Sequence, residues 1–155
     1  MIGIDPGINK LGYSVIENFK ILECGILKPP SKLTFEEKIE FILKNFKKIL
    51  EKYLPDIVSI EEVYVAKNVK TALNMGILVG GIISVILSYN IKFFLIPPSE
   101  IKKMITGKGS ATKEQVKFMV ENLTNFYNFK NFEETDATAS AISAIFKLKE
   151  KCFTL

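Results

Sequence analysis

The chain has 155 residues, of which 48% are hydrophobic, and carries a formal net charge of +4; this length predicts a single domain over residues 1–155. It contains no histidine, which excludes Ser-His-Asp triads, Cys-His dyads and His-ligated zinc. All 21 basic residues are lysine, and a modest positive charge suits a polyanionic partner without requiring one.

The cysteines and the first residues indicate a compartment. Cys24 and Cys152 lie far apart and form no CxxC pair, so we interpret them as reduced thiols. Met1 leads directly into an apolar segment, without the basic region and cleavage site of a signal peptide. We therefore expect a cytoplasmic protein.

The first third of the sequence predicts three strands followed by a helix. Residues 1–5, 12–17 and 20–27 are strand-like and are separated by short turns, which is typical of an antiparallel meander. Thr34 and Glu37 then form a capping box, and apolar residues recur at helical spacing until Pro55 ends the pattern.

The remainder predicts strands at residues 56–63 and 91–96 around an apolar helix at 69–89, and this order implies a parallel strand pair. A short helix follows the second strand, then a Gly-rich loop at 106–110, a helix that begins after Thr112, and a last helix at about 132–149. We expect an α/β fold with a five-stranded mixed sheet, three antiparallel strands then two parallel ones, flanked by helices.

The apolar helix raises the question of a membrane, since residues 71–90 carry no charge. Polar residues and glycines interrupt the apolar run, so we expect a helix buried in a core or in a subunit interface, with no membrane partner. Gly76 and Gly80 form a GxxxG pattern, which favours close helix packing either within the chain or between two subunits.

Four acids stand on elements that should be buried: Asp5 and Glu61 end the first and fourth strands, and Glu133 and Asp136 share a face in the first turn of the last helix. Singly, each has a structural explanation, such as a turn cap for Asp5 or an edge charge for Glu61. Glu134, three residues after Asn131, is interpreted as a capping acid.

Taken together, the four acids predict a cation site. Carboxylates about 4 Å apart repel one another by several kcal/mol at an effective dielectric near 20, so a cluster needs positive charge. Ligation by oxygen alone suits Mg²⁺, with Mn²⁺ as an alternative. Two such ions can catalyse phosphodiester hydrolysis without histidine.

Four sequence blocks carry a resemblance to a known family. They are Ile2-Gly3-Ile4-Asp5-Pro6-Gly7 with Gly12-Tyr13, the segment Ile60 to Asn68, the segment Gly107 to Lys113, and Asp136-Ala137-Thr138-Ala139. In order and spacing they resemble the RuvC family of Holliday junction resolvases, over essentially the whole chain.

The resemblance implies an RNase H-like fold, a homodimer, and Mg²⁺-dependent cutting of two strands at a four-way DNA junction in recombination and repair. It also suggests recruitment by a branch-migration motor. Asp5, Glu61 and Asp136 would be catalytic, metal-binding carboxylates. Glu133 would join them at a position where the family usually has Asp or His.

The resemblance also implies DNA-binding residues. Tyr64 takes the place of an aromatic that stacks on an unpaired base. Lys67, Lys103 and Lys113 match basic positions of the family, and we expect three further lysines to extend this patch: Lys70, Lys102 and Lys108. Because lysine lacks the fork of arginine, these contacts should position DNA rather than read its sequence.

Three other functions remain open. An RNase H-like nuclease could act on RNA or flap substrates with the same carboxylates. The unusual Glu133 allows a junction-binding module that has lost catalysis. The IGIDPG segment also opens actin-like ATPases, although 155 residues leave no room for their second phosphate-binding lobe.

Overall fold

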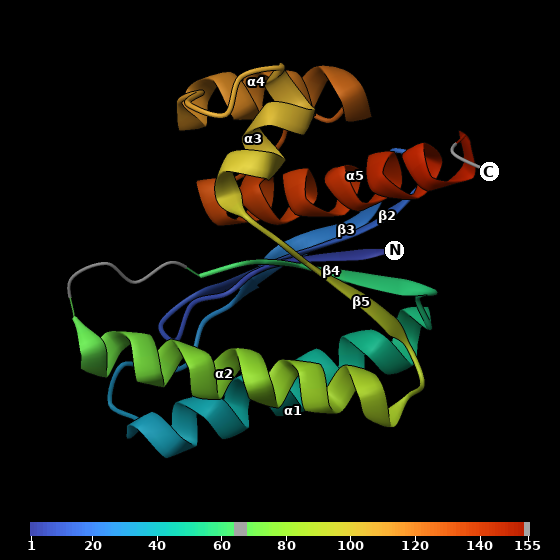
Figure 1. Ribbon diagram of the computed structural model, residues 1–155. Helices are drawn as coiled ribbons and strands as arrows, with labels where there is room; N and C mark the ends of the chain where they lie inside the picture. The colour runs from blue at the N-terminus through green and yellow to red at the C-terminus, as the bar shows by residue number, and fades with distance from the viewer. Residues whose placement is uncertain (64–67, 154–155) are drawn as a thin grey trace.

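The structure, a computed structural model, describes residues 1–63 and 68–153, with side chains to residue 149. Helices cover both faces of one sheet, with α1 and α2 on one side and α5, α3 and α4 on the other (Figure 1). The elements in chain order are β1 (Ile2–Asp5), β2 (Leu11–Glu17), β3 (Lys20–Leu27), α1 (Phe35–Tyr53), β4 (Ile57–Glu61), α2 (Val69–Ser88), β5 (Lys92–Ile96), α3 (Pro98–Thr106), α4 (Lys113–Thr124) and α5 (Phe132–Phe153).

The sheet has the strand order β3-β2-β1-β4-β5. Strands β1, β2 and β3 pair antiparallel, whereas β4 is parallel to both β1 and β5. This arrangement confirms the predicted mixed sheet. It also makes β1 and β4 neighbours, so that their carboxyl ends lie at the same edge.

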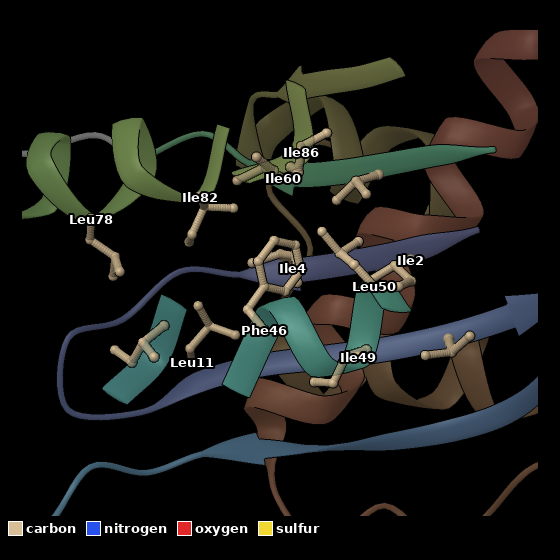
Figure 2. Close-up of a cluster of buried hydrophobic side chains, with 13 residues drawn as sticks. Ile2, Ile4, Leu11, Phe46, Ile49, Leu50, Ile60, Leu78, Ile82 and Ile86 are labelled. Carbon is tan, nitrogen blue, oxygen red and sulfur yellow. The ribbon is translucent and has the colours of Figure 1, made fainter. Parts of the chain in front are cut away.

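One face of the sheet is apolar and packs against α1 and α2. Side chains alternate between the two faces of a strand, so Ile2 and Ile4 of β1 share this face with Ile60 of β4. These three isoleucines are fully buried in a cluster with Phe46 of α1 and Ile82 of α2 (Figure 2). This cluster supports the sheet from one side.

The opposite face is lined by small residues, which let α5 approach closely. A methyl group added to Gly3 would lie 2.0 Å from the backbone oxygen of Ala137, and one added to Gly12 would lie 2.2 Å from that of Glu133. The buried hydroxyls of Ser59 on β4 and Ser140 on α5 are 2.8 Å apart and share a hydrogen bond. The glycines and serines therefore fix α5 against the strand ends.

Helix α2 buries only one stripe of its surface. Leu78, Ile82 and Ile86 are buried, but only 22% of an 18-residue apolar stretch of the helix is buried in all. By length and hydropathy the helix meets the criterion for a membrane span. That criterion is weak evidence for a membrane, because core helices of soluble proteins also meet it. A methyl group on Gly76 or Gly80 would meet nothing within 4 Å. The prediction that these two glycines allow close packing of α2 within the chain is therefore wrong for the described residues.

Two predicted boundaries differ from the structure by more than one residue. Strand β4 ends at Glu61 rather than at residue 63, because its partner β5 ends at Ile96, where the chain turns through Pro97 into α3. Helix α5 continues to Phe153 rather than ending at residue 149.

Candidate active site

Two of the four predicted acids lie side by side at the edge of the sheet. Asp5 ends β1 and Glu61 ends the neighbouring parallel strand β4. By alternation along the strands, Asp5 shares a face with Gly3, and Glu61 shares a face with Ser59. Both of those residues contact α5, so both acids project on the α5 side of the sheet.

The other two acids lie in the first turn of α5, above this edge. Asn131 accepts a hydrogen bond from the backbone N–H of Glu134 (3.1 Å), and the Glu134 carboxylate accepts one from the N–H of Lys130 (2.8 Å). Glu134 is thus the predicted capping residue, and it is 5% exposed. This capping role distinguishes Glu134 from Glu133 and Asp136, whose charges act on Asp5.

The two strand acids are short of positive charge. Burial, together with the neighbouring carboxylates of Glu61, Asp136 and Glu133, raises the pKa of Asp5 to about 8. Burial and the carboxylate of Asp136 raise the pKa of Glu61 to about 7, although nearby lysines oppose this shift. Clustered carboxylates with raised pKa values are a common mark of functional sites.

Lysines contact the two helix acids. The Lys113 ammonium, in the first turn of α4, donates a hydrogen bond to Asp136 (2.9 Å). Lys10, in the turn before β2, lies 3.4 Å from Glu133, and the backbone N–H of Glu133 together with Lys10 lowers the pKa of that carboxyl. The sequence reasoning missed Lys10, which the β1–β2 pairing, with Asp5 opposite Gly12, carries to this edge.

The remaining predicted DNA-binding residues are distributed around the site. Lys102 is close enough to lower the pKa of Glu61, whereas Lys103 and Lys108 are exposed on α3 and the loop that follows it. Lys70 is exposed in the first turn of α2. Tyr64 and Lys67 lie outside the described residues.

The donor set fits a divalent cation chemically. All four acids offer oxygen ligands. A bound cation would lower the raised pKa values of Asp5 and Glu61, because positive charge stabilises the ionised carboxylates. As placed, no three His, Cys, Asp or Glu side chains within the described residues are grouped to hold an ion. Asp136 and Glu133 are instead engaged by Lys113 and Lys10.

A mixed sheet of this order, with carboxylates on its two central parallel strands and on the helix above them, defines an α/β protein of the RNase H-like class. The model of the family "Crossover junction endodeoxyribonuclease RuvC" matches residues 1–144. The chain therefore belongs to the RuvC family.

Individual relatives agree with this assignment. RuvC of Rickettsia prowazekii is 37% identical over 127 residues, covering 79% of this chain and 81% of the relative. RuvC of Chlorobium chlorochromatii is 32% identical over 131 residues, covering 82% and 68%. The solved structure of Thermus thermophilus RuvC in complex with Holliday junction substrate has a TM-score of 0.88 at 24% identity, covering 97% of this chain and 96% of that chain, and it shares the fold.

Proposed function

We propose that this chain is a structure-specific endonuclease that resolves four-way DNA junctions in recombination and repair. Its family consists of DNA-cleaving hydrolases. The observation that carries the proposal is the charge-coupled group of Asp5, Glu61, Glu133 and Asp136 at one edge of the sheet. A relative whose solved structure is in complex with a Holliday junction substrate supports the choice of DNA substrate.

Nucleases of this family are metal-dependent in general, and we assign Mg²⁺ to this site, with Mn²⁺ as a substitute and two ions per site. Asp5, Glu61 and Asp136 would hold the ions, and Glu133 would act directly or through a water molecule. When bound, the ions supply a water of lowered pKa and neutralise charge on the leaving oxygen. The chain's own contribution is to keep two carboxylates buried and poorly neutralised, which favours a divalent cation.

DNA would approach across the lysines around the acidic edge. Lys113 contacts Asp136 and Lys102 acts on Glu61, and Lys103 and Lys108 extend the positive surface. Lysine attracts phosphate as a point charge, so binding should depend on junction shape and on salt more than on base sequence. Stacking by Tyr64 and a phosphate contact by Lys67 remain part of the proposal.

A homodimer is supported by the exposed stripe of α2. The stripe is formed by apolar and small residues at helical spacing, namely Val69, Leu73, Gly76, Ile77, Gly80, Ser84 and Leu87. Ile77 is 53% exposed and Leu73 is 64% exposed, and exposed apolar surface of this kind marks interaction sites. Two-fold pairing would present two identical sites to the two strands that a junction requires.

The proposal also includes a cellular location and a partner. A DNA substrate and the free thiol of Cys24 suit a cytoplasmic protein. Recruitment by a branch-migration motor rests on the family resemblance alone.

The test is to incubate the protein with a synthetic immobile four-way junction and Mg²⁺, and to map the cuts on all four strands. We expect paired cuts on two opposed strands. Linear duplex, structured RNA and flap DNA serve as competing substrates, and preferential cutting of one of these would favour the rival nuclease. Salt-sensitive junction binding with no products in Mg²⁺ or Mn²⁺ would favour the non-catalytic module.

A single substitution connects this activity to the site. Asp5→Asn should reduce nicking at least about 1,000-fold while leaving junction binding intact. Asp56→Asn is the matched control, because this exposed acid precedes β4 at the strand end remote from Glu61. Retained cleavage in Asp5→Asn would contradict the proposed site.

A further inference from the structure

Lys113 forms a specific ion pair inside the acidic site. Its ammonium lies 2.9 Å from Oδ2 of Asp136, whose side chain is only 16% exposed. The first turn of α4 that carries Lys113 is fixed by the capping box of Thr112 and Gln115. The backbone that carries the lysine therefore belongs to a capped helix end rather than to a loop.

The same ammonium acts on the strand acids. Asp5 and Glu61 both lie in the field of Lys113, and each also lies in the field of Asp136. Asp136 is thus the acid that couples to both strand carboxylates, and Lys113 is the cation that engages it.

The second lysine of the site differs in these respects. Lys10 is 3.4 Å from Glu133, whose side chain is 28% exposed. Glu133 acts on Asp5 but is not among the groups that act on Glu61. Lys10 and Lys113 are therefore comparable, because each contacts an acid in the first turn of α5. Only Lys113 contacts Asp136, the acid that acts on both strand carboxylates.

We propose that Lys113 is the counter-cation of the metal-free site, that a divalent cation must displace it from Asp136, and that the displaced ammonium then becomes available to a DNA phosphate. This inference rests on the proposed metal-dependent function. It makes Lys113 a positioning residue with two alternating partners, because an ammonium and a divalent cation at the same carboxylate repel each other, so that binding of the ion favours release of the lysine.

Two consequences follow from this exchange. Lys113 opposes metal binding in the absence of DNA, because breaking the ion pair subtracts from the affinity for the ion. A DNA phosphate that captures the ammonium removes this opposition, so DNA and metal should each strengthen binding of the other by the same factor. The site would thereby load metal preferentially when a substrate is present.

The direct test measures Mn²⁺ affinity by isothermal titration calorimetry without DNA, in the unmodified protein, in Lys113→Met and in Lys10→Met. Methionine keeps the length and apolar stem of lysine and removes the charge. We expect Lys113→Met to bind Mn²⁺ about three to ten times more tightly than the unmodified protein, the modest size reflecting a partly exposed pair. Lys10→Met should change the affinity by less than about twofold.

The outcomes are distinct. Unchanged or weaker Mn²⁺ binding in Lys113→Met overturns the inference, and so does an equal gain in both variants, which would indicate a general charge effect. If Mn²⁺ binds to none of the three proteins, the metal-dependent function itself fails and the inference falls with it. Mn²⁺ binding with the predicted gain in Lys113→Met, in a protein that does not cut junctions, would support the inference while refuting the nuclease.

A second readout needs no substitution. Lysine acetylation, quantified by mass spectrometry with limiting reagent, should become faster at Lys113 when Mg²⁺ is added, because the ion frees the ammonium from Asp136. Lys44, exposed on α1, serves as the internal reference and should not change. A Lys113 rate that does not respond to Mg²⁺ concentrations that saturate the site contradicts displacement.

Discussion

Gly12 lies directly against the backbone carbonyl of Glu133, so that a methyl group on Gly12 would be 2.2 Å from that oxygen. The residue paired with Gly12 across the sheet is Asp5. One close contact between a strand and the first turn of α5 therefore determines how near the helix acids come to the strand acids. The spacing of the site is set by backbone packing as well as by the carboxylates.

Replacing this glycine should separate the two halves of the site. Gly12→Ala forces α5 away from β2, and we expect a loss of about 2–4 kcal/mol in the free energy of unfolding, typical of overpacking against a rigid backbone. Urea denaturation measures it. Gly80→Ala, where a methyl group meets nothing within 4 Å in the chain, should by contrast keep or raise the stability, because alanine favours a helix more than glycine does. Equal stability of Gly12→Ala and the unmodified protein would show that α5 adjusts freely.

The raised pKa of Asp5 makes the metal-free protein sensitive to pH. Folding favours the neutral carboxyl, because its pKa is about 8 in the folded chain against 3.8 for an unperturbed aspartate. The unfolded state loses its proton first as the pH rises, so the stability contributed by Asp5 is full below about pH 4 and is lost progressively up to about pH 8.

Asp5→Asn should remove this loss. In EDTA at pH 8.5, we expect the variant to be more stable than the unmodified protein by about 1–3 kcal/mol, with the difference shrinking towards pH 4. Urea unfolding at both pH values measures it, and Asp56→Asn should show no such gain. Lower stability of Asp5→Asn at pH 8.5 would mean that the ionised carboxylate is well neutralised in the fold.

Substitutions at the adjacent residues Glu134 and Glu133 should affect stability and cleavage activity, respectively. Glu134→Ala removes the acceptor for the Lys130 N–H and should cost about 1–2 kcal/mol of stability, with the cleavage rate per folded molecule unchanged. Glu133→Gln should leave stability nearly unchanged and slow cleavage at least about tenfold. Thermal melting and single-turnover junction cleavage measure the two effects, and the reverse pattern would exchange the assigned roles.

Removing one partner of the buried hydrogen bond between Ser59 and Ser140 should destabilise the protein more than removing both partners. Ser140→Ala leaves the Ser59 hydroxyl buried without its partner, which costs about 1–3 kcal/mol. The double variant Ser59→Ala/Ser140→Ala should recover part of this loss, because no unpaired hydroxyl remains. A double variant that is less stable by the full sum of the single changes would contradict this explanation.

A charge placed on the exposed stripe of α2 should prevent dimerisation. Ile77→Lys buries an unpaired ammonium in the proposed interface and should weaken self-association at least about tenfold, as measured by analytical ultracentrifugation. Phe118→Lys is the control, since Phe118 is equally apolar and 63% exposed but lies on α4. Dimers that persist in Ile77→Lys would assign the interface to another surface.

Much of this architecture could be predicted from sequence because its signals are local. The strand-like first segment placed Asp5 at the end of a strand that should be buried, and Thr34 and Thr112 marked where α1 and α4 begin. The mixed sheet followed from short turns between the first strands and a helical crossover between the last two. The position of Asp5 beside Glu61 then required only that their strands be neighbours.

Other features depend on geometry that no local pattern specifies. The pairing of Lys10 with Glu133 joins residues 123 positions apart through the shape of a turn. The helical phase of α3 decides that Lys102, rather than the adjacent Lys103, acts on Glu61. The engagement of Asp136 by Lys113 depends on how α4 and α5 pack, which periodicity within either helix does not determine.

The acidic site draws on both the beginning and the far part of the described chain, with Asp5 in the first strand and Asp136 in the last helix. During synthesis, a ribosome must translate residue 136 and release α5 before any of its acids can meet those of the sheet. Incomplete translation products that carry only the sheet consequently have half of the carboxylates. If these acids cut DNA as proposed, a nascent chain would be unable to nick DNA before α5 has docked.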